Sequence, residues 1–314
     1  MKKFTFGLFT LLFLASCASD SDDPSDTSKD SYKINIQASV QSTNLVKAGP
    51  INSGFTTDFP IGIYAYNGAW KSGATANVIN NDQATVLGAA GHAVTFASGP
   101  YYYPSDGTPL EFFAFAPQGT EATAAGVGTS PVVTHAMTGQ EDIMWASSSG
   151  HKSGSSAAVH PTLSFQHQLT QLQFTFKSDA TYPASGNSVV SLTVNTQPNL
   201  ATMTVGTGAC VFSGSAAMQA LSTANQTSGI GITTAGTSAN SPIMTAPASS
   251  FSITIIVKPA GGGSNVTYTS IPVALTALKG NAHLVTLTFT ATSVTASATV
   301  ADWITGTGGN VSVL

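Results

Sequence analysis

The sequence predicts an all-β protein built from antiparallel sandwiches, and three observations support this prediction. Apolar and polar residues alternate with a period of two along most of the chain, while the 3.6-residue period of helices is almost absent. Clusters of Gly, Pro, Asn and Ser separate the alternating segments, as turns do. Many short strands with frequent breakers are typical of β-sandwiches. The first such segment presents one apolar face, made of Tyr32, Ile34, Ile36, Ala38 and Val40.

The N-terminus has the pattern of a secretion signal. Two lysines precede an apolar run, Phe4–Leu14, that is too short to span a bilayer as a helix, so residues 1–16 predict a signal peptide. The sequence LASC, ending at Cys17, resembles a bacterial lipobox, which predicts cleavage before Cys17 and lipid on that residue. Two acyl chains are enough for stable anchoring. The alternative is an ordinary signal peptide whose cleavage site contains a cysteine.

Residues 17–31 predict a flexible tether, because they are rich in Ser and Asp and contain no large apolar residue. An acidic run directly after a lipidated cysteine resembles the signal that sends Bacteroidales lipoproteins to the outer leaflet of the outer membrane. We therefore expect a surface-exposed lipoprotein of the cell outer membrane. The alternative is a plain solvated linker.

Composition excludes several classes of partner. Charged residues make up 8% of the chain, there are ten lysines and no arginine, and the net charge is −4. This balance argues against nucleic acid or an anionic membrane as a partner. Removal of 16 residues leaves 314 − 16 = 298, enough for two sandwiches. With Cys17 lipidated, Cys210 has no disulfide partner, and we expect it to be a small buried apolar residue.

The strand pattern predicts two domains. Further alternating segments are Ile61–Tyr66, Ala93–Phe96, Leu110–Ala116, Val189–Asn195, Phe251–Lys258, Val266–Val273, Leu284–Thr290 and Val294–Val300. Pro161–Ser178 also alternates but is too long for one strand, so we divide it near His167. We expect an N-terminal sandwich over residues 32–166 and a C-terminal sandwich over residues 167–314, each with its own core.

The sequence contains no pattern that points to catalysis, a metal or a cofactor. The histidines lack metal-site spacing, and no carboxylate stands near one in the sequence as a metal shell requires. Outside the tether, Glu141 and Asp142 are the only adjacent carboxylates, and neighbours on a strand point to opposite faces. No nucleophile elbow or phosphate-binding loop occurs. We therefore expect a protein that is not an enzyme.

One aromatic motif has two interpretations. Tyr101, Tyr102 and Tyr103 could present ring faces to a sugar. They could also form a strand end that leads into the turn Pro104–Gly107, and we favour this second interpretation.

Several motifs together resemble the fimbrillin family, the lipoprotein subunits of type V pili in Bacteroidales. They are PIGIYAY, YYYPSDGTPLEFFAFAP, EDIMWAS, LSFQHQLTQLQFTF, and LKGNAHLVTLTF followed by VADW. Their order and spacing extend the resemblance over nearly the whole mature chain. The resemblance implies two transthyretin-like antiparallel sandwiches in tandem and a structural or adhesive subunit of a surface fimbria.

The resemblance also implies assembly by strand exchange. A protease cuts after a basic residue that follows the first strand, this strand leaves, and a strand from another subunit fills the groove. The matching position here is Lys47, followed by Ala48, where family members commonly have arginine; the alternative is that Lys47 only solvates a loop. The displaced strand would be Tyr32–Val40, and we expect Ile34 and Ile36 to be buried in it.

Two C-terminal segments are candidate donor strands. We favour the tail with Val311, Val313 and Leu314, because Val294–Val300 is expected to pair with Leu284–Thr290 inside its own sandwich. The expected partners are other fimbrial subunits, a lipid anchor before processing, and a host or bacterial surface ligand. An alternative function is a surface lipoprotein that binds glycans or host ligands without polymerising, which a row of exposed aromatic side chains would favour.

Overall fold

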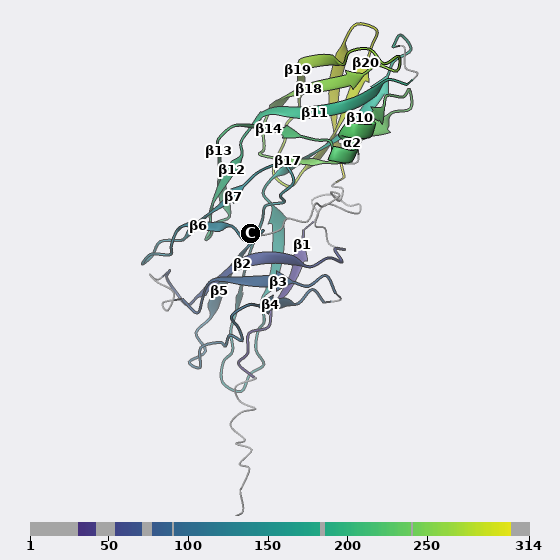
Figure 1. The fold of residues 1–314 in the computed structure, drawn as a ribbon. Helices are drawn as coiled ribbons and strands as arrows, with labels where there is room; N and C mark the ends of the chain where they lie inside the picture. Colours follow the sequence, from purple (N-terminus) through teal and green to yellow (C-terminus); the bar gives the residue numbers. More distant parts are fainter. Residues whose placement is uncertain are drawn as a thin grey trace, which may run out of the picture.

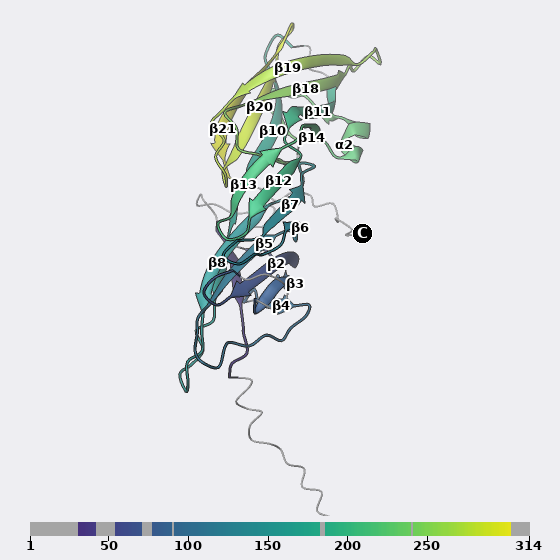
Figure 2. The same ribbon diagram turned by 90° about the vertical axis from the view of Figure 1, so that its left-hand side faces the viewer.

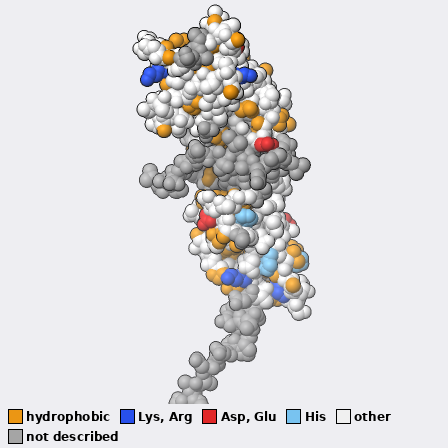
Figure 3. Space-filling view, turned by 90° about the vertical axis from the view of Figure 1, so that its right-hand side faces the viewer, with side chains coloured by type: hydrophobic (Ala, Val, Ile, Leu, Met, Phe, Trp, Pro, Cys, Tyr) orange, Lys and Arg blue, Asp and Glu red, His pale blue; other side chains and the backbone are white. Residues whose placement is uncertain are grey.

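The structure is a computed structural model that describes residues 31–41, 54–70, 77–89, 91–182, 186–239 and 241–302. The molecule is elongated, with the N-terminal sheets at one end and the C-terminal sheets at the other (Figures 1 and 2). Charged side chains are sparse on the face in Figure 3, as the composition predicts. The fold is all-β, which confirms the predicted class.

A seven-stranded sheet forms the N-terminal end, in the order β1-β9-β8-β5-β2-β3-β4. Its strands are β1 (Gln37–Val40), β2 (Phe59–Tyr66), β3 (Ile79–Val86), β4 (Val94–Phe96), β5 (Leu110–Ala116), β8 (Met144–Gly150) and β9 (Thr162–His167). All neighbours are antiparallel except β1 and β9, which are parallel. On its other side β1 meets the chain just before β4, through a bridge between Gln37 and Ala93. The sheet therefore closes on itself through β1.

The central strands β2 and β5 are buried on both faces. Ile63 and Phe112 belong to the core inside the closed sheet, whereas Tyr64 and Phe115 belong to a second core on its outer face. Gly62 permits this packing, because a Cβ atom there would lie 2.3 Å from the ring of Phe115. A continuous apolar run such as FFAFA is typical of a strand covered on both sides.

A four-stranded sheet covers this outer face and joins the two ends of the molecule. Its order is β13-β12-β7-β6. The strands are β6 (Thr120–Thr123), β7 (Val132–Ala136), β12 (Leu200–Thr204) and β13 (Ala209–Ser213). The first two precede residue 167 in the chain and the last two follow it. Both predicted domains therefore contribute strands to one sheet, and the division at residue 167 stays a prediction.

Two five-stranded sheets face each other at the C-terminal end. One contains β10 (Thr170–Ser178), β16 (Thr237–Ser238), β17 (Ile243–Thr245), β20 (Ala282–Phe289) and β21 (Val294–Ala301). The other contains β11 (Ser188–Gln197), β14 (Ala216–Gln219), β15 (Ile230–Gly231), β18 (Ser250–Lys258) and β19 (Val266–Ala274). Their facing side chains, including Phe174, Leu192, Ile253 and Leu287, form the shared core. The short helix α2 (Thr223–Ser228) is the one α-helix in the described residues.

The predicted strands all occur, and their ends differ by at most two residues except in the first, which was predicted from Tyr32 and begins as a regular strand at Gln37. Pro161–Ser178 divides into β9 and β10 as expected, and β21 pairs with β20 along its whole length. One difference from the antiparallel expectation is that β10 and β20 are parallel, as are β1 and β9. Each of these pairs joins strands far apart in sequence, which a local pattern cannot reveal.

Candidate functional site

The first strand fills an apolar slot in the closed sheet. Ile34, Ile36, Ala38 and Val40 are buried there, while Lys33, Asn35 and Gln37 are exposed. The predicted burial of Ile34 and Ile36 is therefore confirmed. Burial of such a side chain contributes about 1.5–3 kcal/mol. Tyr32, at the start of the segment, is half-buried.

Backbone hydrogen bonds hold the segment on both sides. On one side β1 follows β9 in parallel register from Gln37 opposite Thr162 to Val40 opposite Phe165. On the other side the amide of Ala38 donates to the carbonyl of His92 (3.0 Å), and the amide of Val94 donates to the carbonyl of Ile36 (2.9 Å).

The start of the segment is bound in the same way by a second stretch of chain. The amide of Ile34 donates a hydrogen bond to the carbonyl of Tyr101 (2.8 Å), and the amide of Tyr103 donates one to the carbonyl of Tyr32 (2.8 Å). Removal of residues 32–40 would leave unpaired backbone groups along both rims of an apolar slot, and unpaired strand edges of this kind accept another strand.

A buried lysine lies beneath the start of the segment. The Nζ atom of Lys152 lies 5.0 Å from the ring centroid of Tyr32, at cation–π distance. The same ammonium donates hydrogen bonds to the carbonyls of Gly154 and Ser156. Because Lys152 is buried, the ring of Tyr32 shields its charge from water. No local sequence pattern indicates this contact, because Tyr32 and Lys152 lie far apart in the chain, before β1 and after β8.

The remaining predicted site residues lie outside the described residues. They are Cys17 at the lipobox, Lys47 and Ala48 at the expected cut, and Val311, Val313 and Leu314 in the tail. Lipidation, processing and strand donation at these positions therefore stay predictions. The competing segment Val294–Val300 is occupied, because β21 pairs with β20 from Val294 opposite Phe289 to Ala301 opposite Ala282.

One histidine has a carboxylate partner that the sequence did not reveal. The Nδ1 atom of His167 lies 2.8 Å from Oδ1 of Asp142, and both side chains are buried. The sequence shows no carboxylate close to His167, because the two residues are 25 positions apart and meet only where β9 ends. Among the described residues no group of three or more His, Cys, Asp or Glu side chains could hold a metal ion.

The tyrosine triplet lies mainly in the protein interior. Tyr103 is buried and donates its hydroxyl to the carbonyl of Val159 (3.0 Å), and burial raises its pKa to about 12. Tyr101 is half-buried with its ring at an edge-on angle to Phe96, at 5.1 Å. Tyr102 is the one large aromatic among the exposed apolar residues of the described chain, at 39% exposure. A row of exposed aromatic side chains is thus absent from the described residues.

Cys210 is half-buried on β13, and burial raises the pKa of its thiol to about 11. The thiol therefore stays protonated and weakly nucleophilic at neutral pH. None of the described helices is long and apolar enough to cross a membrane.

Solved structures of several Bacteroides proteins share this fold. A protein of Bacteroides ovatus, provisionally assigned to cell adhesion, is 16% identical with a TM-score of 0.55, over 87% of this chain and 98% of its own. A similarly assigned protein of Bacteroides uniformis is 20% identical with a TM-score of 0.53, over 86% and 98%. A fimbrial protein of Bacteroides vulgatus is 14% identical with a TM-score of 0.51, over 87% and 99%. At these identities the likeness shows the fold.

The sequence itself matches a family as well. A comparison with curated protein sequences gives no match. The fimbrillin-like family, however, matches residues 46–303, which is most of the chain. This match covers strands from both ends of the molecule and agrees with the motifs in the sequence. The chain therefore belongs to the fimbrillin-like family.

Proposed function

We propose that this protein is a structural or adhesive subunit of a surface fimbria, and that it polymerises by protease-triggered strand exchange. The observation that carries the proposal is the slot that holds Tyr32–Val40. A segment held by backbone hydrogen bonds and alternate side chains can be replaced by another strand of similar pattern. Membership of the fimbrillin-like family supports this assignment. In this proposal the protein is a structural subunit and has no catalytic role.

The first steps place the subunit at the cell surface. Signal peptide 1–16 directs export, the lipid on Cys17 anchors the chain in the outer membrane, and residues 17–31 form the tether. A cut between Lys47 and Ala48 lies between β1 and β2, so it severs the covalent link between the first strand and the rest of the fold. An enzyme that accepts lysine is required, because the chain contains no arginine.

The donor strand then comes from another subunit. We assign this role to the tail with Val311, Val313 and Leu314, because Val311 and Val313 alternate with a polar residue and β21 is already paired within its own sheet. The partners are therefore other fimbrial subunits, with a host or bacterial surface ligand for the finished fimbria.

The deciding experiment is the N-terminal sequence of the protein recovered from sheared surface filaments. A start at Ala48 is expected. Purified protein cut after Lys47 should polymerise, and deletion of residues 310–314 should suppress this while the monomer stays folded. The variant Lys47→Ala serves as the uncut control.

Two outcomes would contradict parts of the proposal. If the cut protein stays monomeric at high concentration with its first strand bound, the chain is an anchor or a surface binder rather than a polymerising subunit. If polymerisation is equally efficient without residues 310–314, the tail is not the donor.

A further inference from the structure

A buried cation lies at the end of the strand slot where Tyr32 enters. Lys152 follows β8 in the connection that leads to β9, at the N-terminal end of the molecule (Figure 2). It is 4% exposed, and among the described residues no carboxylate forms an ion pair with it. A buried ammonium is costly unless other groups compensate its charge. The groups that do so here determine what this end of the slot can accept.

Two backbone carbonyls and one aromatic ring compensate the charge of this ammonium. The Nζ atom of Lys152 donates hydrogen bonds to the carbonyls of Gly154 (2.5 Å) and Ser156, and it lies 5.0 Å from the ring centroid of Tyr32. This separation is within the range of about 6 Å in which a cation and an aromatic ring attract each other. Because an ammonium has three donors, the carbonyls leave one N–H group for the ring.

The connection that carries Lys152 is held in place by contacts outside the first strand. His151 and Val159 exchange two backbone hydrogen bonds across it, at 3.1 and 2.8 Å. The hydroxyl of Tyr103 donates to the carbonyl of Val159 (3.0 Å), which ties this connection to one rim of the slot. The position of the ammonium therefore does not depend on Tyr32, and we expect the ammonium to stay there when another strand enters.

The ring belongs to the strand, whereas the cation belongs to the slot. Tyr32 is half-buried and stands two positions before Ile34, the first of the four buried apolar side chains of the segment. Its carbonyl accepts a hydrogen bond from the amide of Tyr103 (2.8 Å), which fixes the register at this end. Any strand that enters the slot in the same register presents its own side chain to Lys152 at this position.

We propose that Lys152 selects strands for the slot by the residue at this position, and that it favours an aromatic ring there. This inference rests on the proposed strand exchange. An aliphatic side chain would cover the ammonium without compensating its charge, and a small side chain would leave the ammonium open to water. The best occupant is a strand with Tyr, Phe or Trp two residues before an alternating run of aliphatic residues.

This preference distinguishes between possible donor strands. In the tail, Gly309 stands two positions before Val311, so a tail that places Val311 where Ile34 lies has no ring for Lys152. Such a joint has aliphatic contacts but lacks the cation–π contact. A subunit whose donor strand carries an aromatic residue at this position should therefore bind the slot more tightly than a copy of this chain does.

The test varies position 32 within the uncut chain, so that it depends on neither cutting nor polymerisation. The amide of Tyr103, which bonds to the carbonyl of Tyr32, reports by hydrogen exchange how often this end of the segment opens. Tyr32→Leu should accelerate this exchange about tenfold, whereas Tyr32→Phe, which keeps the ring, should change it less than about twofold.

A second substitution shows whether Lys152 is the cause. In Lys152→Met the difference between Tyr32 and Tyr32→Leu should fall to about twofold or less, as measured in a double-mutant cycle. In Lys152→Arg, which keeps the positive charge, the difference should persist. Lys33→Met is the matched control, because Lys33 is exposed and adjoins Tyr32 in the chain, and it should leave the difference unchanged.

Three results would overturn the proposal. They are equal exchange in Tyr32→Leu and Tyr32→Phe, a difference that persists in Lys152→Met, or equal protection by Tyr32→Glu and Tyr32→Phe, which would make negative charge the selected property. If Lys152→Met does not fold, the comparison of Leu, Phe and Glu at position 32 decides the outcome. Because the uncut chain is used, a failure here leaves the proposed strand exchange standing, and a cut chain that stays monomeric leaves the ring preference standing.

Discussion

His135 on β7 is a buried histidine whose two ring nitrogens have no hydrogen-bond partner among the described residues. It packs against the edge of Phe115, with ring centroids 6.0 Å apart. Because burial disfavours the charged imidazolium, the pKa of His135 falls from 6.5 to about 4. The folded state therefore binds fewer protons than the unfolded state at mildly acidic pH.

This predicts a loss of stability in acid. The free energy of unfolding should be constant above pH 6.5, should decrease as the pH falls toward 4, and should lose about 3 kcal/mol in total through His135. His283, whose pKa burial also lowers, acts in the same direction. Urea unfolding between pH 7.5 and 4 gives the profile. His135→Leu should flatten it, and an unchanged profile in that variant would assign the acid sensitivity to other groups.

Asp142 and His167 form the buried pair at the end of β9. In the described part of the chain the second carboxylate oxygen of Asp142 has no hydrogen-bond partner, so this side chain depends on His167. Loss of one member leaves the other buried with a broken contact, whereas replacement of both by apolar residues removes the demand for hydrogen bonds altogether.

We therefore predict strong coupling between these two positions. Asp142→Leu should lower the free energy of unfolding by about 2 kcal/mol, and His167→Leu should do the same. The double variant should cost clearly less than the sum of the two, as measured by urea unfolding in a double-mutant cycle. Additive losses would show that the interaction between the two side chains does not contribute to the free energy of unfolding.

At the scale of elements, β1 is distinguished by its neighbours. It is short, yet residues 32–40 use both backbone edges, with β9 on one side and residues 92–103 on the other. Such a segment can open separately from the rest of the sheet, since the strands β9, β8, β5 and β2 pair with one another without it.

Hydrogen exchange in the intact chain can detect this opening. Ile36→Ala removes a buried side chain at a cost of about 2 kcal/mol or more, so the amides of Val94 and Tyr103, which bond to this segment, should exchange roughly 30-fold faster. Gln37→Ala, at an exposed position of the same segment, should leave both rates unchanged. If amides throughout the first sheet accelerate together instead, the segment does not open as a separate element.

Elements with large alternating side chains were predictable from the sequence. Leu110–Ala116 was predicted with its observed ends, and Pro161–Ser178 divides where expected, because apolar periodicity reports local burial. Strands such as β3 and β8 were missed, since their sequences INNDQATV and MWASSSG are rich in polar or hydroxyl side chains. In β3 the buried Asp82 is satisfied by the amide of Ser98, a contact that no local pattern contains.

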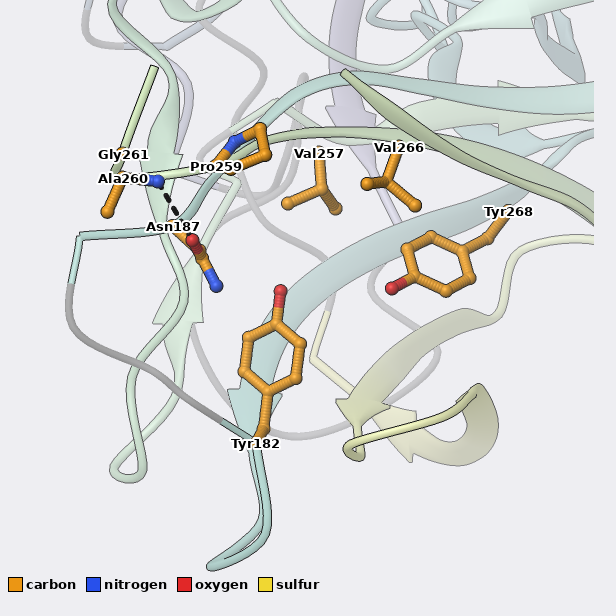
Figure 4. A pocket seen from close by; sticks show the side chains of 8 residues that line it. All are labelled: Tyr182, Asn187, Val257, Pro259, Ala260, Gly261, Val266 and Tyr268. Atoms are coloured by element: carbon orange, nitrogen blue, oxygen red, sulfur yellow. Dashed lines mark hydrogen bonds between the residues drawn. The ribbon is translucent and has the colours of Figure 1, made fainter. Parts of the chain in front are cut away.

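The candidate site was predictable only in part. Alternation revealed that Ile34 and Ile36 face a core, but it could not reveal that β9 and residues 92–103 supply the rims of the slot. Tyr182 and Asn187, between β10 and β11, line one pocket together with Tyr268 of β19 (Figure 4), and no local sequence pattern shows that these residues meet. Pairings between distant segments depend on tertiary packing, which a single sequence does not display locally.

At the scale of the whole molecule, the β13-β12-β7-β6 sheet links the two predicted domains. β7 and β12 pair over five residues, from Val132 opposite Thr204 to Ala136 opposite Leu200. The aromatic residues Tyr64 and Trp70 of the first part also lie in the same core as the C-terminal sandwich. The ends of the molecule are therefore joined by hydrogen bonds and by apolar packing.

This predicts the behaviour of a chain divided at residue 167. Fragments 32–166 and 167–314 should each keep their main sheets, and they should associate when mixed, because β7 and β12 complete one another's sheet. Size-exclusion chromatography of the mixture tests this. Val133→Asp, which places a charge in the buried interface, should abolish association. Fragments that fold but stay apart would make the domains independent, and fragments that both fail to fold would indicate one continuous core.

The pairing of β1 with β9 also has a consequence for the order of folding. Ser39 and Ser164, which meet across these strands at 3.1 Å, are 125 positions apart in the chain. Closing so long a loop is entropically costly and slow, so we expect β1 to enter its slot after the strands around it have formed. A newly folded subunit would then have an empty slot for a time. Its own strand fills the slot because the covalent connection gives that strand a high effective concentration. In the proposed assembly, the cut after Lys47 removes this kinetic advantage, and the strand of a neighbouring subunit then competes on equal terms.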